Sequence, residues 1–481
     1  MMRDAADNPS GRPVDNGSPD SVNAPMATEF KAPRAARSTM PPVPPMLPTS
    51  HVSHGSAGQS IAIWAGFALL LVVLPWCFPS DAALTLMTQM GTAAILALSF
   101  NLLLGSTGLL SFCHATYAGI GAYAGVWCMN RIGAGALPIS MFIVPLAGAA
   151  AGAMAGATLG FVTTRRAGMT FAMITLGVAE LVWVVAAMLP EWFGGERGIA
   201  TDRTLGAPWL RLTFGSQREV YGLVAVWLFI CAALMYGVTR TPLGFLARAV
   251  RDNAGRVAFL GQSPAAVRYR MQIIAAAFAG VAGSLGALNF ELASADTFSL
   301  ERSGVVLVFT VLGGTAYFAG PMVGAVIGVF ATVVLATMTR AWQLYLGLGF
   351  LAVVVFAPGG VAGLVAGHMQ VLQTFRQSTV RRLWRPYLAV CAGLAMVVGG
   401  LIAVVEMTYG IRLAVASAVD PGQSWWAGGG ASSGWARWGV AMLSLMLGAA
   451  WLYRAWPRLI DAVRHVAGHV GRLARGAGDR P

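Results

Sequence analysis

The sequence predicts an all-α protein, a polytopic transmembrane helical bundle with about 10 core spans and 2 further C-terminal spans. Hydrophobic residues make up 57% of the 481 residues and charged residues only 11%, whereas a soluble domain carries about 25% charged residues. Apolar runs long enough to cross a hydrocarbon core of about 30 Å recur along the chain. Because backbone groups in lipid must find hydrogen-bond partners within the protein, we expect these runs to be helices.

The first region, residues 1–59, is rich in Pro, Ser, Ala, Asp and Asn and has no apolar period. A segment of this composition cannot bury enough apolar surface to offset the entropy of ordering it. We therefore expect a disordered N-terminal tail.

The second region, residues 60–365, is expected to be the transmembrane domain. Its predicted spans are 61–78, 84–104, 114–130, 139–163, 169–189, 220–239, 271–290, 303–317, 318–338 and 342–357. The spans 114–130 and 303–317 are short and rich in Gly or flanked by it, a pattern compatible with discontinuous or re-entrant segments.

The third region, residues 366–481, is expected to be a C-terminal extension with two further spans, 386–406 and 435–453. From Arg454 onward, apolar residues recur at helical spacing and arginines fall mostly between them. This pattern predicts an amphipathic basic tail that lies on anionic membrane lipid.

The arginines set the expected orientation. With the N-terminus in the cytoplasm, the dense Arg clusters at 165–166, 240–270 and 376–385 and the C-terminal tail all fall on the cytoplasmic side. This distribution follows the positive-inside rule. The rule accounts for the net charge of +13, so we do not expect a nucleic-acid partner, and both termini are predicted to be cytoplasmic.

Several kinds of chemistry have no motif in this sequence. The five cysteines form no C-x-x-C pair, and neither His nor Cys residues have metal-ligand spacing to His114, so we expect no metal site. No Gly-Lys pair occurs, so the phosphate-binding P-loop is missing. We expect no catalytic residues and no cofactor in this chain; if ATP drives it, partner subunits bind and hydrolyse that ATP.

A basic loop of about thirty residues, 240–270, interrupts the apolar spans. Its middle part, Phe245 to Leu260, has apolar residues at helical spacing, namely Leu246, Val250, Val257 and Leu260. The residues expected to couple the loop to a partner are Arg248, Arg251, Asp252, Arg256 and Gly261. We interpret the loop as a short coupling helix parallel to the membrane; the alternative is an ordinary positive-inside loop.

Five polar residues are candidates for lining a path through the membrane. They are Glu180, His114, Ser111, Asn101 and Asn289. Ionisable groups in a bilayer are costly and normally face a bundle interior or water. Glu180 could contact an ammonium group in transit or be a structural carboxylate. His114 could line the path or orient the loop 105–113, and the two asparagines could instead form interhelical hydrogen bonds.

Several ordered motifs resemble one permease family. The segment Gly108–Tyr123, GLLSFCHATYAGIGAY, resembles the signature G-x-L-S-x-G-H-A-x-F-x-G-I-G-A-Y, and Gly313–Ala325, GGTAYFAGPMVGA, resembles a late motif of the same family. Arg248–Gly261 is similar to its coupling loop. The family is the branched-chain amino-acid type of bacterial ABC importer permease, specifically the second of its two unlike permease subunits, and the resemblance covers about residues 80–365.

The resemblance implies a transport subunit rather than an enzyme. It implies a multi-pass protein of the bacterial inner membrane that works with an unlike second permease, two cytoplasmic ATPases and a periplasmic solute-binding protein. Three alternatives stay open: a permease for urea or short amides, an ion-coupled secondary transporter and a non-transporting membrane scaffold.

Overall fold

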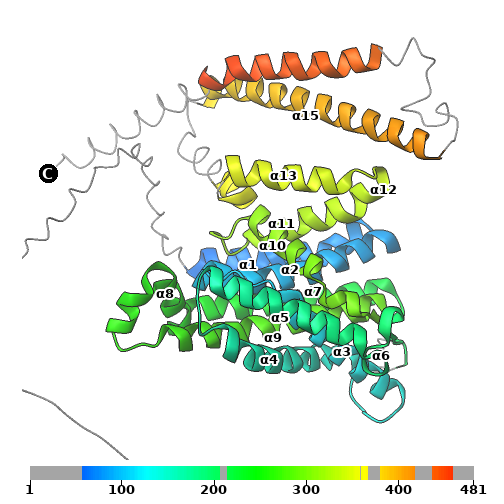
Figure 1. Cartoon of the computed structure of the whole chain (residues 1–481), viewed down its shortest axis with the longest axis vertical. Coiled ribbons are helices and arrows are strands. Elements are labelled where there is room, and N and C mark those ends of the chain that lie inside the picture. Colours follow the sequence, from blue (N-terminus) through cyan, green and yellow to red (C-terminus); the bar gives the residue numbers. More distant parts are fainter. Residues whose placement is uncertain (1–56, 206–213, 358, 367–379, 418–435, 459–481) are drawn as a thin grey trace, which may run out of the picture. The chain divides into compact units, whose positions relative to one another are not determined.

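The computed structural model describes residues 57–205, 214–357, 359–366, 380–417 and 436–458, and helices dominate this part of the chain (Figure 1). Every predicted span overlaps a helix, so the all-α polytopic bundle is confirmed. The predicted disordered N-terminal tail, residues 1–59, overlaps the start of the first helix, which begins at Ala57. Residues 1–56 and the amphipathic tail beyond residue 458 lie outside the described residues.

The first half of the described chain runs from α1 to α7. Its elements are α1 (Ala57–Cys77), α2 (Asp81–Thr107), α3 (His114–Gly133), η1 (Met141–Ile143), α4 (Val144–Thr163), α5 (Met169–Met188), α6 (Pro190–Phe193), η2 (Gly195–Arg197), β1 (Ile199–Ala200) and α7 (Gln217–Arg240). Serine side chains begin two of the long helices: Ser80 caps α2 and Ser216 caps α7, each accepting a hydrogen bond from a backbone N–H three residues later.

The second half begins with α8, which follows α7 after one residue. Its elements are α8 (Pro242–Phe259), α9 (Pro264–Phe290), β2 (Leu292–Ala293), η3 (Ala295–Phe298), α10 (Leu300–Gly313), α11 (Gly320–Val329), the π-helical η4 (Phe330–Leu335), α12 (Ala336–Met338), α13 (Trp342–Phe356), a short helix Gly360–Ala366, α15 (Val380–Ser417) and a last helix at 436–458. The strands β1 and β2 form one antiparallel pair, with Ile199 opposite Ala293.

Within the described residues, seven helices are long and apolar enough to cross a membrane, or eight if the bent pair Trp342–Phe356 and Gly360–Ala366 is one span. The seven are Asp81–Thr107, Met141–Thr163, Met169–Met188, Gln217–Arg240, Pro264–Phe290, Gly320–Met338 and Leu388–Tyr409. The predicted span 114–130 is one continuous helix of 20 residues. The predicted span 303–317 is wrong at its end, because α10 stops at Gly313 and Gly314 adopts a φ of 104°.

The core forms where α3, α4 and α9 pack backbone against backbone. The α4 glycines that recur every fourth residue, including Gly148 and Gly152, face α9 of the same chain. A Cβ atom on Gly280 of α9 would lie 2.1 Å from the carbonyl oxygen of Gly148, and one on Gly121 of α3 would lie 2.3 Å from that of Gly280. Small residues thus allow the helices to approach closely. Van der Waals packing then stabilises the contact in lipid, where the hydrophobic effect does not drive helices together.

The chain splits into two compact units at Trp64 and Ala65, inside α1. The described part of the first unit is residues 57–64, in which Ile61 and Ile63 are exposed. The second unit begins at Ala65 and holds α2 and all later elements. The region boundaries predicted from the sequence, after residues 59 and 365, stay predictions.

Candidate functional site

The predicted coupling helix is α8, and it consists of two half-helices. Asn253 has an extended backbone, with φ −156° and ψ 95°, which breaks the helix. Its Oδ1 accepts a hydrogen bond from the backbone N–H of Arg256 at 2.9 Å, so Asn253 caps the second half-helix. The prediction of one helix from Phe245 to Leu260 is therefore wrong in this respect, because an internal cap interrupts the helical period.

Two of the predicted coupling arginines bind inside the subunit. Arg248 Nη1 donates to the carbonyl oxygen of Thr239 at 3.1 Å, and its guanidinium lies 4.7 Å from the ring centroid of Phe245. Arg251 Nη1 donates to the carbonyl oxygen of Gly105. Thr239 and Gly105 lie in the last turns of α7 and α2, where carbonyl groups lack helical partners and the helix dipole favours a cation.

Much of the second half-helix, and the residues that follow it, are left open for a partner. Arg256 and Gly261 are exposed, as is Asp252 just before the break, and Gly261 has a φ of 78°. Phe259 is 95% exposed and Leu260 is 74% exposed. Leu260, which continues the helical spacing of Val257 in the sequence, lies beyond the end of α8 at Phe259, and only Val257 of the pair is buried.

The loop between α2 and α3, together with the first turn of α3, is tied to three helices. The backbone N–H of Phe112 donates to Thr175 Oγ1 on α5 at 3.1 Å, and that of Ala115 donates to Ser303 Oγ on α10 at 3.1 Å. His114 Nε2 lies 2.7 Å from Ser99 Oγ on α2. The loop starts at Gly108, whose φ of 70° favours glycine. Movement of any of these helices would therefore act on the loop.

The candidate path residues fall into different environments. His114 and Ser111 are fully buried within the subunit. Ser111 Oγ and Asn101 Oδ1 have no hydrogen-bond partner among the described residues. Asn101 lines a cavity of about 170 Å³ with Arg248 and Phe318, at the same end of the bundle as α8. These residues are not gathered around one channel within this chain.

Glu180 lies half-buried on α5. Among the described residues it makes no hydrogen bond, and Thr175 on the same helix donates to the carbonyl oxygen of Ala172 at 2.9 Å. Only 28% of the apolar window of α5 is buried, so this helix leaves much of its surface to lipid or to another subunit. A carboxylate in this position is compatible with a path formed between two subunits.

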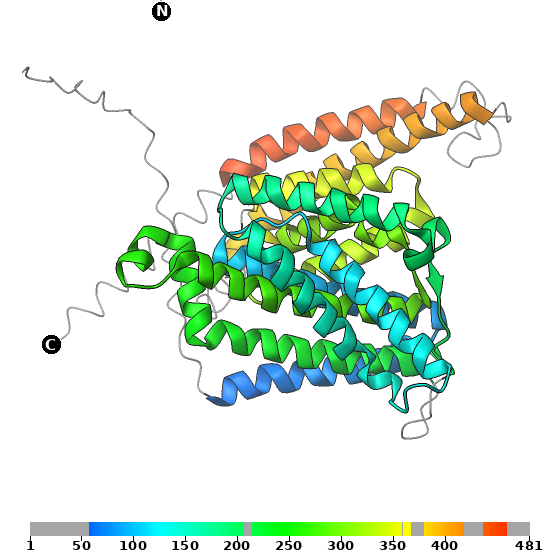
Figure 2. The same cartoon turned by 60° about the horizontal axis from the view of Figure 1, so that its bottom comes forward.

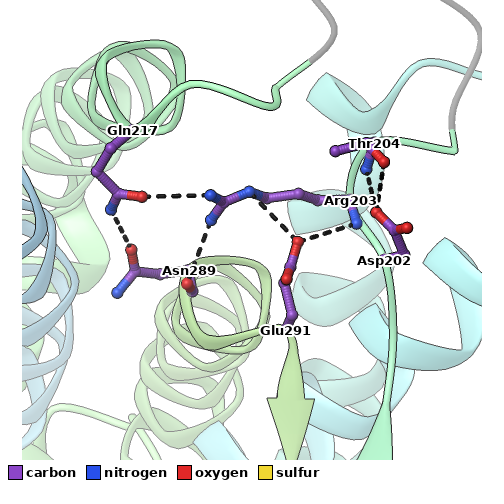
Figure 3. A network of polar contacts seen from close by, with 6 residues as sticks. All are labelled: Asp202, Arg203, Thr204, Gln217, Asn289 and Glu291. Carbon is purple, nitrogen blue, oxygen red and sulfur yellow. Dashed lines mark hydrogen bonds and ion pairs between the residues drawn. The ribbon is translucent and has the colours of Figure 1, made fainter. Parts of the chain in front are cut away.

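Asn289 belongs to a polar network at the C-terminal end of α9, the end that lies away from α8 (Figure 3). Its Oδ1 accepts from Gln217 Nε2 of α7 at 2.9 Å, and its carbonyl oxygen accepts from Arg203 Nη1 at 3.3 Å. Arg203 also donates to Gln217 Oε1 at 3.3 Å and forms an ion pair with Glu291 at 3.4 Å. The Asn289 side chain therefore bridges α7 and α9.

Of the residues in this network, only Asn289 was a candidate from the sequence, and no motif marks Arg203 or Glu291. Glu291 has a φ of 55° although it is not glycine, and the sequence carries no signal for this conformation. Beside Arg203, hydrogen bonds from the side chain and backbone of Thr204 lower the pKa of the exposed Asp202. The network fixes the segment after β1 to the N-terminal end of α7 and the C-terminal end of α9.

No group of three or more His, Cys, Asp or Glu residues that could hold a metal ion occurs within the described ranges. The turned view shows α8 projecting from the helical bundle, beyond the ends of the long helices (Figure 2). The chain thus has two candidate functional sites. One is the projecting, partly apolar α8, and the other is the polar network around Arg203 and Asn289 at the other end of the bundle.

Comparison with known proteins gives a single family. The sequence model described as "Branched-chain amino acid transport system / permease component" matches residues 82–357. Two relatives, from Salmonella typhimurium and from Escherichia coli strain K12, are both named high-affinity branched-chain amino acid transport system permease protein LivM. Each is 29% identical over 326 residues, which is 63% of this chain and 76% of the relative. No solved structure matches the chain.

Proposed function

Because the chain belongs to the branched-chain amino acid transport permease family, we propose that it is the membrane-spanning subunit of a bacterial ABC importer for branched-chain or related amino acids. It would reside in the inner membrane with both termini in the cytoplasm. It would form the path with a second, unlike permease and receive its solute from a periplasmic binding protein. Two cytoplasmic ATPases would bind and hydrolyse the ATP.

The family match over residues 82–357 carries this proposal. The form of α8 supports the part that concerns the ATPases. Phe259 and Leu260 present apolar surface on a segment that projects from the bundle, and exposed apolar groups next to an arginine are typical of protein-binding sites. We expect this tip, rather than Arg248 and Arg251, to contact an ATPase.

The hydrogen bonds of Arg248 and Arg251 within the chain suggest how movement of the tip would reach the path. Arg248 binds the end of α7 and Arg251 binds the end of α2. The end of α2 continues into the loop that is hydrogen-bonded to α5 through Thr175. ATP-driven displacement of α8 would therefore move α2 and α7 together and change the position of α5, which carries Glu180.

Uptake of labelled leucine and labelled urea, measured in the native host with the gene present and deleted, tests the proposal. Loss of leucine uptake alone is the expected result. Loss of urea uptake alone would keep the transport machine and change the solute. Unchanged uptake of both would contradict the proposed substrate class.

Glu180→Gln is expected to reduce leucine uptake at least about tenfold while the protein accumulates normally. The physical reason is that a hydrogen bond to a charged group contributes about 1.5–3 kcal/mol, and the amide would no longer neutralise an ammonium group in transit. Glu191→Gln, on the exposed α6, is the matched control and should transport normally. Loss of folded protein in Glu180→Gln would indicate a structural carboxylate instead.

A further inference from the structure

The C-terminal extension forms a packed helical hairpin that lies beyond the family match. Its two arms are α15 and the helix 436–458, which run side by side (Figure 1). Trp451 Nε1 donates to the carbonyl oxygen of Ala389 at 2.8 Å, and Ser444 Oγ donates to that of Met396 at 3.0 Å. Gly400 and Gly448 lie where the arms approach most closely, since a Cβ on either would meet the opposite arm within 3.0 Å.

One carboxylate of this hairpin reaches the transmembrane domain. Glu406 Oε1 accepts hydrogen bonds from Thr339 Oγ1 at 2.5 Å and from Tyr345 Oη at 2.9 Å. Glu406 is half-buried and lies three residues before the end of the apolar window Leu388–Tyr409. An ionisable residue in such a segment is costly unless it has partners, and here two hydroxyl groups from a distant part of the chain supply them.

The receiving surface is built to accept a carboxylate. Thr339 lies between α12 and α13, and its Oγ1 also accepts the backbone N–H of Ala341 at 3.0 Å. Ala341 directly precedes α13, so Glu406 is held at the N-terminal end of a helix of 15 residues. Such an end favours negative charge, and hydroxyl donors to an ionised carboxylate form strong hydrogen bonds.

We propose that the corner between α12 and α13 is an interaction surface, and that its partner is the chain's own C-terminal hairpin, docked there by Glu406. The corner is the surface formed by Thr339, Tyr345 and the first turn of α13. With the hairpin docked, Thr339 and Tyr345 are half-buried at this corner. The corner is then occupied and not available to a second permease subunit, a statement that rests on the proposed function.

The docking can be measured on the full chain with a protease site inserted between residues 370 and 375 and cut after purification. The C-terminal fragment should remain bound to the rest of the protein. Glu406→Leu should raise the dissociation constant of the fragment roughly eightfold or more, the factor expected for losing two interhelical hydrogen bonds. Glu406→Gln should raise the dissociation constant less than Glu406→Leu does, because the amide keeps an accepting oxygen and loses only the charge.

Thr408→Val is the matched control, because Thr408 Oγ1 donates only to the carbonyl oxygen of Val404 on its own helix, and it should behave as the wild type. Tyr345→Phe tests the other side of the contact and should weaken retention about threefold, the share of one hydrogen bond. Retention in Glu406→Leu equal to the wild type would overturn the proposal. If that variant fails to fold, equal retention in Tyr345→Phe would overturn it.

A photo-crosslinking residue at the exposed Arg340, beside Thr339, tests occupation of the corner in the native membrane. After protease cutting, crosslinking should rejoin the two fragments of one chain, and Glu406→Leu should lose this product. A product that contains a different subunit instead would overturn the proposal. Neither readout depends on the solute, so loss of the proposed leucine uptake would leave both results interpretable.

Discussion

Gly280→Val is expected to abolish the accumulation of folded protein. The position is the centre of the contact among α3, α4 and α9, where a Cβ would lie 2.1 Å from the carbonyl oxygen of Gly148 and 3.1 Å from the Cα of Gly152. These atoms belong to the backbone, so no side-chain rotation can make room. Overpacking a core usually costs about 1–3 kcal/mol, and separating two helix backbones should exceed that range.

The matched control for this change is Gly286→Val, on the same helix. A Cβ at Gly286 meets no atom within 4 Å, so the variant carries the same loss of glycine without the collision. The measurement is the amount of monodisperse protein after detergent extraction, with thermal unfolding of whatever is recovered. Normal recovery of Gly280→Val would contradict the backbone contact between α4 and α9.

Phe259→Asp is expected to reduce leucine uptake below about one thirtieth of the wild-type rate while leaving the fold intact. The side chain is 95% exposed, so an aspartate there costs the isolated chain little. An aromatic residue at the centre of a protein interface contributes at least about 2 kcal/mol, which corresponds to the expected factor. The measurements are uptake in cells and copurification of the ATPases.

Arg251→Glu distinguishes ATPase docking at the tip from the hydrogen bond that Arg251 donates to α2. This change would place a carboxylate at the C-terminal end of α2, where the carbonyl oxygen of Gly105 now accepts from Arg251, and the helix dipole disfavours it. We expect lower thermal stability together with lost uptake, whereas Phe259→Asp should lose uptake alone. Phe78→Asp, at an exposed Phe that follows α1, is the control that should transport normally. Full uptake in Phe259→Asp would exclude the tip as the ATPase contact.

The helices were predictable from the sequence because lipid imposes a strong rule on the chain. Each apolar run must form a helix, and serines at positions such as 80 and 216 begin helices by a local hydrogen bond. The break in α8 was harder to predict. Leu246, Val250 and Val257 keep a helical spacing across Asn253, and the period alone does not reveal that the asparagine side chain caps a new helix.

The contacts of the polar residues could not be predicted, because they join positions far apart in the chain. Glu406 lies in a predicted span, but its partners Thr339 and Tyr345 belong to a different region. Arg203 and Asn289 are 86 positions apart, and nothing in the local pattern of either residue indicates the other. The arginine pattern predicts the side of the membrane on which α8 lies, but it does not predict which carbonyl groups Arg248 and Arg251 contact.

The glycine contacts among α3, α4 and α9 also limit how the protein can change shape. Helices in backbone contact cannot slide past one another without collision, so this trio should behave as a rigid body during any conformational cycle. Motion is then left to helices joined to it by side chains and single hydrogen bonds, above all α5, whose link to the loop before α3 is the hydrogen bond between Phe112 and Thr175. In relaxation measurements, exchange on the microsecond to millisecond timescale should therefore concentrate in α5 and be weak at Gly280.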